Sequence, residues 1–152
     1  MADVSTDRFT VGVFQDVQWA ERGLEALGRH GFRREALSVI AKTTPDVDAL
    51  IERTLGVTPR HAEVRNLGPT SLAGPLVEAL DGEAQDFARL GIAATMRRVG
   101  FQPHDGMIYE RLVLRGGVLV GVVGEARAAD ALATLHAYGG GNAAIGAWTG
   151  RV

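Results

Sequence analysis

Two short apolar runs, one near each end of the chain, dominate the pattern of hydrophobic positions. They are Phe9–Phe14 (FTVGVF) and Gly116–Gly124 (GGVLVGVVG), and both are rich in β-branched residues. Short apolar runs bounded by turn residues are typical of strands that are buried on both faces. We therefore expect these two runs to form central strands of a sheet.

A helix-like segment and a second strand-like segment follow each apolar run. Asp16 can cap a helix that continues to about His30, and Ala36–Ala41 then has the pattern of a strand. Near the other end, the pattern predicts a helix over 125–138 and a strand over 142–148. With a one-residue deletion in the turn, the two ends align as diverged repeats. The aligned positions are Ala20 with Ala128, Leu24 with Leu132, Leu27 with Leu135 and Gly31 with Gly139.

The segment between the two repeats, residues 42–115, is predicted to be mostly helical. Thr44 is a good N-cap and Pro45 fits the first helical position, whereas Pro75 interrupts the apolar segment around it. The predicted elements are a helix from Thr44 to about Gly56, a short edge strand over 61–67, a break at Gly68-Pro69, an irregular segment over 71–82, and helices over 83–99 and 103–115 with Met107, Ile108 and Leu112 facing inward.

Two βαβ units in one sheet describe an α+β fold, a ferredoxin-like sandwich with a mostly helical insertion between the units. In that topology the first and third strands are central, and here they are the two most apolar runs. A doubly wound parallel sheet is the alternative. We expect a flexible N-terminus over 1–8 and one domain over 9–152, divided into a first unit (9–41), a middle segment (42–115) and a second unit (116–152).

The composition limits the classes of function that the chain can have. Its 152 residues, of which 46% are hydrophobic, fit one domain with a substantial core. A net charge of −2, with Lys42 as the only lysine, does not favour general binding of nucleic acid. The absence of cysteine excludes disulfides and thiolate chemistry. Since the sequence shows neither a signal peptide nor an apolar run of about 18 residues, we expect a cytoplasmic protein with no membrane span.

The histidines do not form a recognisable metal or catalytic motif. None of them is paired with another histidine or a carboxylate at a known metal-binding spacing, and we interpret them as solvated or as capping residues near helix ends. A haem- or metal-dependent enzyme that uses one of them is the least favoured of the alternatives. The four histidines are His30, His61, His104 and His136.

Serines and glycines give no catalytic or phosphate-binding signature. Ser38 and Ser71 lack the Gly-x-Ser-x-Gly surroundings of a nucleophile elbow. The pair Gly116-Gly117 precedes its strand, whereas a phosphate loop lies between a strand and the following helix, so we interpret the pair as a helix stop. Tyr109 is interpreted as a half-buried core residue. We therefore predict no enzyme activity, no catalytic residue, no metal site and no cofactor.

The second face of the predicted sheet carries apolar side chains that need a cover. If Val11, Val13, Val118, Val120 and Val122 face the two repeat helices, alternation along the strands turns the residues between them the other way. Soluble monomers rarely expose such a patch, so either the middle segment or a second copy of the chain should cover it. We favour a homodimer in which the middle segment supplies part of the contact. The candidate interface residues are Phe14, Leu119, Val123, Leu76 and Phe87.

Several of these features together resemble one known protein family. The N-terminal strand is followed by Ala20-Glu21-Arg22, a Leu-x-x-Leu pair and Gly31-Phe32 before the next strand. Later come Gly100-Phe101, then Met107–Arg111 (MIYER), then Leu114–Val120 (LRGGVLV). This order is similar to the general stress protein (YflT-like, heat-induced stress) domain, over about residues 9–150. The resemblance implies an association with stress and no established reaction.

The sequence thus predicts a non-enzymatic, stress-associated module that acts through self-association or by binding a partner. The alternative is a small-molecule-sensing domain, because ferredoxin-like sandwiches often hold ligands at subunit edges.

Overall fold

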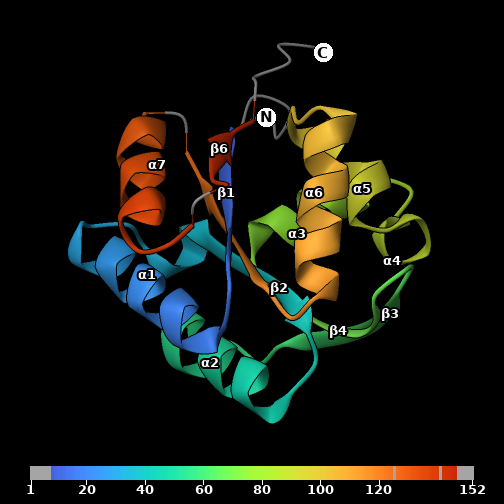
Figure 1. Cartoon of the computed structure of the whole chain (residues 1–152), viewed down its shortest axis with the longest axis horizontal. Coiled ribbons are helices and arrows are strands. Elements are labelled where there is room, and N and C mark those ends of the chain that lie inside the picture. Colours follow the sequence, from blue (N-terminus) through green and yellow to red (C-terminus); the bar gives the residue numbers. More distant parts are fainter. Residues whose placement is uncertain (1–7, 125, 141, 147–152) are drawn as a thin grey trace.

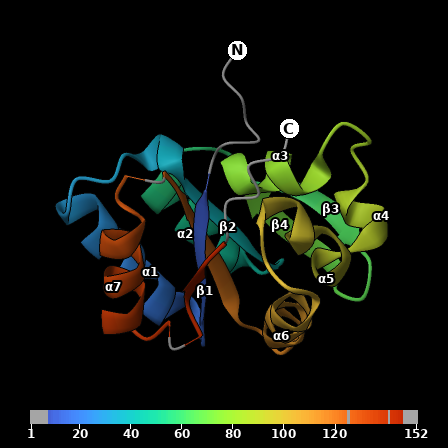
Figure 2. The same ribbon diagram turned by 90° about the horizontal axis from the view of Figure 1, so that it is seen from above.

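The computed structural model of the chain describes residues 8–124, 126–140 and 142–146. These residues form a mixed α+β fold in which one antiparallel sheet lies between two layers of helices (Figure 1, Figure 2). The strands are β1 (Phe9–Phe14), β2 (Leu37–Lys42), β3 (Arg60–Val64), β4 (Gly68–Ala73), β5 (Val118–Val123) and β6 (Ala144–Ile145).

Helices cover both faces of the sheet. In Figure 1, α1, α2 and α7 lie on the left and below, and α3 to α6 lie on the right. Two 3₁₀ turns complete the described chain. The helices are α1 (Val17–Arg29), α2 (Pro45–Leu55), α3 (Pro75–Asp81), α4 (Phe87–Leu90), α5 (Ile92–Thr95), α6 (Pro103–Leu114) and α7 (Ala128–Ala137), and the 3₁₀ turns are η2 (Arg34–Ala36) and η3 (Met96–Val99).

The order of strands across the sheet is β3-β4-β2-β5-β1-β6. The two most apolar strands, β1 and β5, are adjacent and antiparallel, as the sequence predicts. The two predicted βαβ units supply four of the six strands that the described residues form; β3 overlaps the edge strand predicted over 61–67, and β4, which was not predicted, joins it to β2. Every paired neighbour is antiparallel, which rules out the doubly wound parallel alternative. The order of the whole sheet is not that of a simple ferredoxin-like sandwich.

The register of β1 against β5 corrects the predicted assignment of faces. Residues directly opposite each other in an antiparallel pair share a face. Phe14 is opposite Val118, so it packs in the cluster under α1, α2 and α7. Val13 is opposite Leu119 and packs with it on the other face. The prediction was right for β5 and wrong for β1 by one position, because a strand that is apolar on both faces gives no alternation to fix its phase.

Local sequence signals account for the positions at which the first two helices begin. The side chain of Asp16 accepts a hydrogen bond from the backbone N–H of Trp19, and Thr44 does the same for Val47. Pro45 occupies the first position of α2, where its missing N–H has no cost. Both predicted caps are confirmed, because a cap depends only on residues within one turn of the helix.

The middle segment differs from its predicted elements at four places. The segment over 71–82, predicted to be irregular, contains the end of β4 and the regular helix α3. The predicted break at Gly68-Pro69 is the start of β4. The helix predicted over 83–99 is divided into α4, α5 and η3, because Gly91 has φ +91° and ends α4. On α6, Met107 was expected to face inward and is instead 52% exposed. Met107 is exposed because α6 is rotated so that Tyr109 and Val113 face the core.

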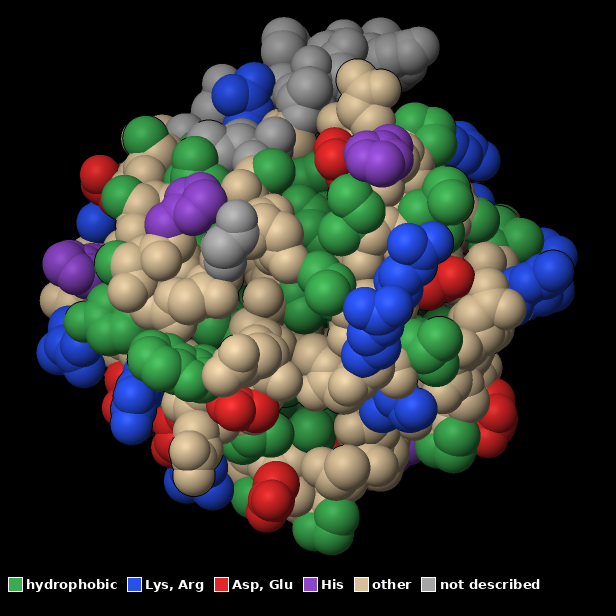
Figure 3. Space-filling model, in the orientation of Figure 1, with side chains coloured by type: hydrophobic (Ala, Val, Ile, Leu, Met, Phe, Trp, Pro, Cys, Tyr) green, Lys and Arg blue, Asp and Glu red, His purple; other side chains and the backbone are tan. Residues whose placement is uncertain are grey.

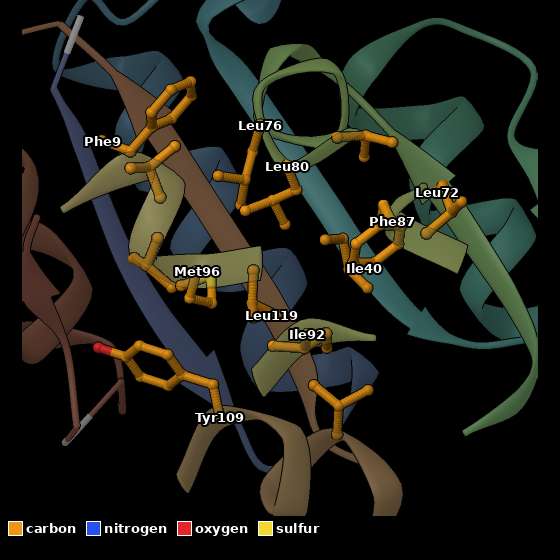
Figure 4. Packing of buried hydrophobic residues seen from close by; sticks show 14 of the residues in the cluster. Phe9, Ile40, Leu72, Leu76, Leu80, Phe87, Ile92, Met96, Tyr109 and Leu119 are labelled. Atoms are coloured by element: carbon orange, nitrogen blue, oxygen red, sulfur yellow. The ribbon is translucent and has the colours of Figure 1, made fainter. Parts of the chain in front are cut away.

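The middle segment covers the second face of the sheet within one chain. Figure 4 shows Ile40 of β2 and Leu119 of β5 pointing toward Leu80, Ile92 and Met96, which come from α3, α5 and η3. All five side chains are completely buried. The apolar patch that led us to expect a homodimer through this face is therefore already covered, and the argument for that dimer no longer holds.

Contacts with β2 and β5 hold α3 close against the sheet. The hydroxyl of Ser38 on β2 accepts a hydrogen bond from the backbone N–H of Leu76 at 2.9 Å and so caps α3, which has no capping side chain of its own. Gly121 lets the helix approach closely, since a Cβ there would lie 2.9 Å from Cδ2 of Leu76.

Truncation of Leu119 should destabilise the whole fold. Leu119→Ala is expected to lower the free energy of unfolding by about 2–5 kcal/mol, because it leaves a cavity between the sheet and the middle segment. Leu114→Ala is the matched control: that side chain is 44% exposed, and its loss should change the free energy of unfolding by about 0.5 kcal/mol or less. Urea unfolding of both variants measures the difference, and equal effects would contradict the assigned faces.

Candidate functional site

The residues predicted to form an interface lie inside the chain. Phe14, Leu119, Leu76 and Phe87 are each 0% exposed, and Val123 is partly buried against the cluster that contains Leu119. Phe14 belongs to the cluster on the opposite face of the sheet. Buried side chains on two faces cannot form a surface for a second molecule, so the structure does not support this set as an interface.

The histidines are all exposed and lie on separate elements. His30 follows α1, His104 and His136 lie on α6 and α7, and His61 lies on β3. Within the described ranges, no three histidine or acidic side chains come together in a way that could hold a metal ion. Of the four, His61 is joined to a carboxylate by hydrogen bonds.

A chain of four polar side chains links β3 and β4 to the start of α2. Nε2 of His61 lies 3.0 Å from Oδ2 and 3.1 Å from Oδ1 of Asp48. The hydroxyl of Ser71 donates to Oδ1 of Asp48 at 2.6 Å. Because Ser71 uses its proton for Asp48, the hydroxyl of Thr43, 2.9 Å away, donates to Ser71. The chain therefore runs from His61 through Asp48 and Ser71 to Thr43.

The order of groups in this chain is not that of a nucleophile activated by a base. In a catalytic triad the histidine lies between the serine and the carboxylate, whereas here Asp48 lies between Ser71 and His61. Ser71 is also 0% exposed and cannot reach a substrate. The chain instead ties β3 and β4 to α2.

The carboxylate of Asp48 is stabilised in its charged form. Burial raises the pKa of Asp48, but hydrogen bonds from Ser71 and His61 and the charge of His61 outweigh it, so the pKa lies below its usual value of 3.8. The sequence did not reveal this group of residues, because its members are 13 and 23 positions apart and because β4 was not predicted. A prediction of the β3–β4 hairpin would have placed His61 and Ser71 on neighbouring strands.

The pairing of β4 with both neighbours shows which way its backbone groups point. The carbonyl of Pro69 accepts a hydrogen bond from the N–H of Thr43 at the end of β2. Backbone polar groups alternate between the two sides of a strand, so those of Thr70 point to β3, where Thr70 lies opposite Ala62. Ala62 is therefore hydrogen-bonded to β4.

The neighbours of Ala62 on β3, His61 and Glu63, consequently direct their backbone N–H and C=O groups away from the sheet. Both side chains are exposed. One end of this edge is closed, since the N–H of Arg65 donates to the carbonyl of Ala88 at 2.8 Å. What remains is a short open edge with a basic and an acidic residue on either side of Ala62, and we call His61–Glu63 the open edge.

Comparison with the models of known protein families, with curated protein sequences and with solved structures finds no match. The resemblance to the general stress protein domain therefore stays a prediction from the sequence. None of the helices in the described part of the chain is long and apolar enough to cross a bilayer.

Replacement of Asp48 should give a stability loss that depends on pH. The pKa of Asp48 is lowered in the folded state, so its contribution is complete above about pH 4 and is lost as the pH falls through the folded-state pKa. Asp48→Asn should therefore lower the melting temperature at neutral pH, and the gap from the native protein should shrink below about pH 4. Asp46→Asn, at an exposed position two residues earlier in the same first turn of α2, should give a smaller difference in melting temperature from the native protein. A gap for Asp48→Asn that is constant from pH 7 to pH 3 would contradict the assigned hydrogen bonds.

Proposed function

We propose that the chain is a non-enzymatic module that associates with a second copy of itself through the open edge of β3. The observation that carries this proposal is the arrangement of His61 and Glu63 on either side of Ala62, with their backbone groups pointing outward. In this proposal, strands β6, β1, β5 and β2 with α1 and α7 form a ferredoxin-like unit, and β3 and β4 extend it to provide the edge.

Two copies of the open edge are complementary to each other. If two β3 strands run antiparallel about a two-fold axis at Ala62, His61 of each copy lies opposite Glu63 of the other. Each such pair exchanges two N–H···O=C hydrogen bonds, which gives about four across the contact. The side chains of each pair share a face of the combined sheet. The contact therefore holds two pairs, each with His61 of one copy beside Glu63 of the other.

The charge pattern favours association over protection of the edge. Edge strands that avoid pairing often carry lysines, a proline or a bulge, so that a second copy meets like charge or a missing donor. The open edge has none of these, and in the antiparallel arrangement its basic residue lies opposite the acidic residue of the second copy. Asp48 holds the ring of His61 in place, which reduces the entropy lost when the edge pairs.

The expected dimer is weak, because the edge is short. An interface of two or three residues per strand, with neighbouring side chains, is at the small end of specific interfaces. We expect a dissociation constant of about 10 µM to 1 mM. The stress association, bacterial origin and cytoplasmic location are part of the proposal and are supported by the sequence pattern alone.

Reversal of the charge at Glu63 should abolish association. Glu63→Arg places arginine opposite His61 of the second copy, and sedimentation velocity over a range of concentrations should then show only monomer. The matched control is Glu52→Arg, which makes the same change of charge on an exposed position of α2 and should leave the dimer intact.

A mixing experiment separates loss of pairing from loss of folding. His61→Glu and Glu63→Arg should each be monomeric alone, because two acidic or two basic side chains face each other, whereas an equal mixture should form a heterodimer in which each pair joins an acidic and a basic side chain. Circular dichroism of each variant checks that it is folded. A native protein that stays monomeric at about 1 mM, or a dimer that survives Glu63→Arg, would overturn the proposal.

A further inference from the structure

A hollow of about 430 Å³ lies beyond the end of β1, between the end of α6 on one side and Gly139 and Asn142 on the other. This volume is within the usual range for sites that bind small molecules. The floor is apolar and the rim carries three polar side chains. In the floor, the side chains of Val13 and Phe14 are buried and that of Leu112 is partly exposed, and Gln15, Arg115 and Asn142 lie at the rim.

The hollow exists because β6 is too short to cover the whole of β1. β6 pairs only with Thr10 and Val11 among the described residues of β1. Further along the strand, the N–H of Val13 donates to Oδ1 of Asn142 at 2.9 Å instead of to a neighbouring strand. The carbonyl of Val13 points to the same side as its N–H and is an acceptor at the edge of the hollow.

Asn142 is held in place by two contacts. Its Oδ1 accepts from Val13, and its backbone carbonyl accepts from the hydroxyl of Tyr109 at 3.3 Å. Tyr109 is itself buried, its ring packs edge-on against Phe101, and burial raises the pKa of Tyr109 to about 12, so the hydroxyl keeps its proton. With Oδ1 occupied, the amide NH₂ of Asn142 remains a donor for a group in the hollow.

Arg115 provides a positive charge at the rim. Within the part of the chain that the structure describes, its guanidinium makes no hydrogen bond or ion pair. Figure 3 shows basic side chains gathered over α6, right of centre, on the face seen in Figure 1. Arg115 also lines a second hollow, together with Lys42, Asp16 and Asp46. Lys42 donates to the carbonyl of Leu114 at 3.3 Å, so its charge is directed to the end of α6.

We propose that this hollow binds a small carboxylate with an apolar body. Arg115 and the amide NH₂ of Asn142 supply donors for the carboxylate, and a guanidinium suits a carboxylate because it can donate two parallel hydrogen bonds. The partly exposed side chain of Leu112 in the floor packs against the apolar part of the ligand. The open edge of β3 lies at the other side of the sheet, so this site does not depend on self-association.

Phenylacetate and its neutral amide, phenylacetamide, test the proposal. In amide ¹H–¹⁵N spectra of the full chain, phenylacetate should give saturable shifts at Gln15, Arg115 and Asn142. Phenylacetamide should bind at least about tenfold more weakly, because it cannot form a charged pair with the guanidinium.

Substitution on α6 identifies the charged group that recognises the ligand. Arg115→Gln should weaken phenylacetate binding by at least about tenfold, whereas Arg111→Gln, one turn earlier and outside the hollow, should leave it unchanged. Both positions are exposed, so both variants should fold. The proposal is overturned if no shifts appear at about 10 mM phenylacetate, if Arg115→Gln binds as the native protein does, or if the amide binds equally well.

Discussion

The central strand β5 carries apolar side chains on both of its faces, and the rest of the structure is arranged to keep both faces away from water. Val118, Val120 and Val122 pack under α1, α2 and α7, and Leu119 packs under the middle segment. Each buried side chain of this kind is worth about 1.5–3 kcal/mol relative to exposure. A two-layer sandwich, with helices on one face of the sheet only, would leave the apolar side chains of the other face in water and lose the free energy of burying them. The long middle segment is therefore part of the fold and not an appendage to it.

Elements that depend on neighbouring residues could be predicted from the sequence. Asp16 and Thr44 cap helices whose first turns lie directly after them, and β1 and β5 are marked by their own composition. The register of β1 was not predictable in the same way, because its side chains are apolar on both faces. The break at Gly91 shows a similar limit, since the helical pattern of the surrounding residues continues across a glycine that adopts positive φ.

The candidate sites were less accessible to sequence reasoning than the fold. His61 and Ser71 act through Asp48, and Asn142 acts through Val13, which is 129 positions away. The sheet brings these residues together, and no pattern of neighbouring residues in the sequence predicts their contacts. The two sites also lie at opposite edges of the sheet, where the outer side of β3 has no partner strand among the described residues and where β6 stops short. In both cases the feature that matters is a missing neighbour strand.

The position of β5 in the sheet also constrains the order of events during synthesis. β5 pairs with both β1 and β2, yet it follows β2 by about 75 residues along the chain. A ribosome that has made the first 117 residues has therefore produced β1 and β2 without the strand that joins them. The native hydrogen bonds between β5 and the facing edges of β1 and β2 can therefore form only after β5 emerges, and until then these edges lack their native partner. Insertion of a late strand between two early ones gives many contacts of large sequence separation, which predicts slow folding for a chain of this length.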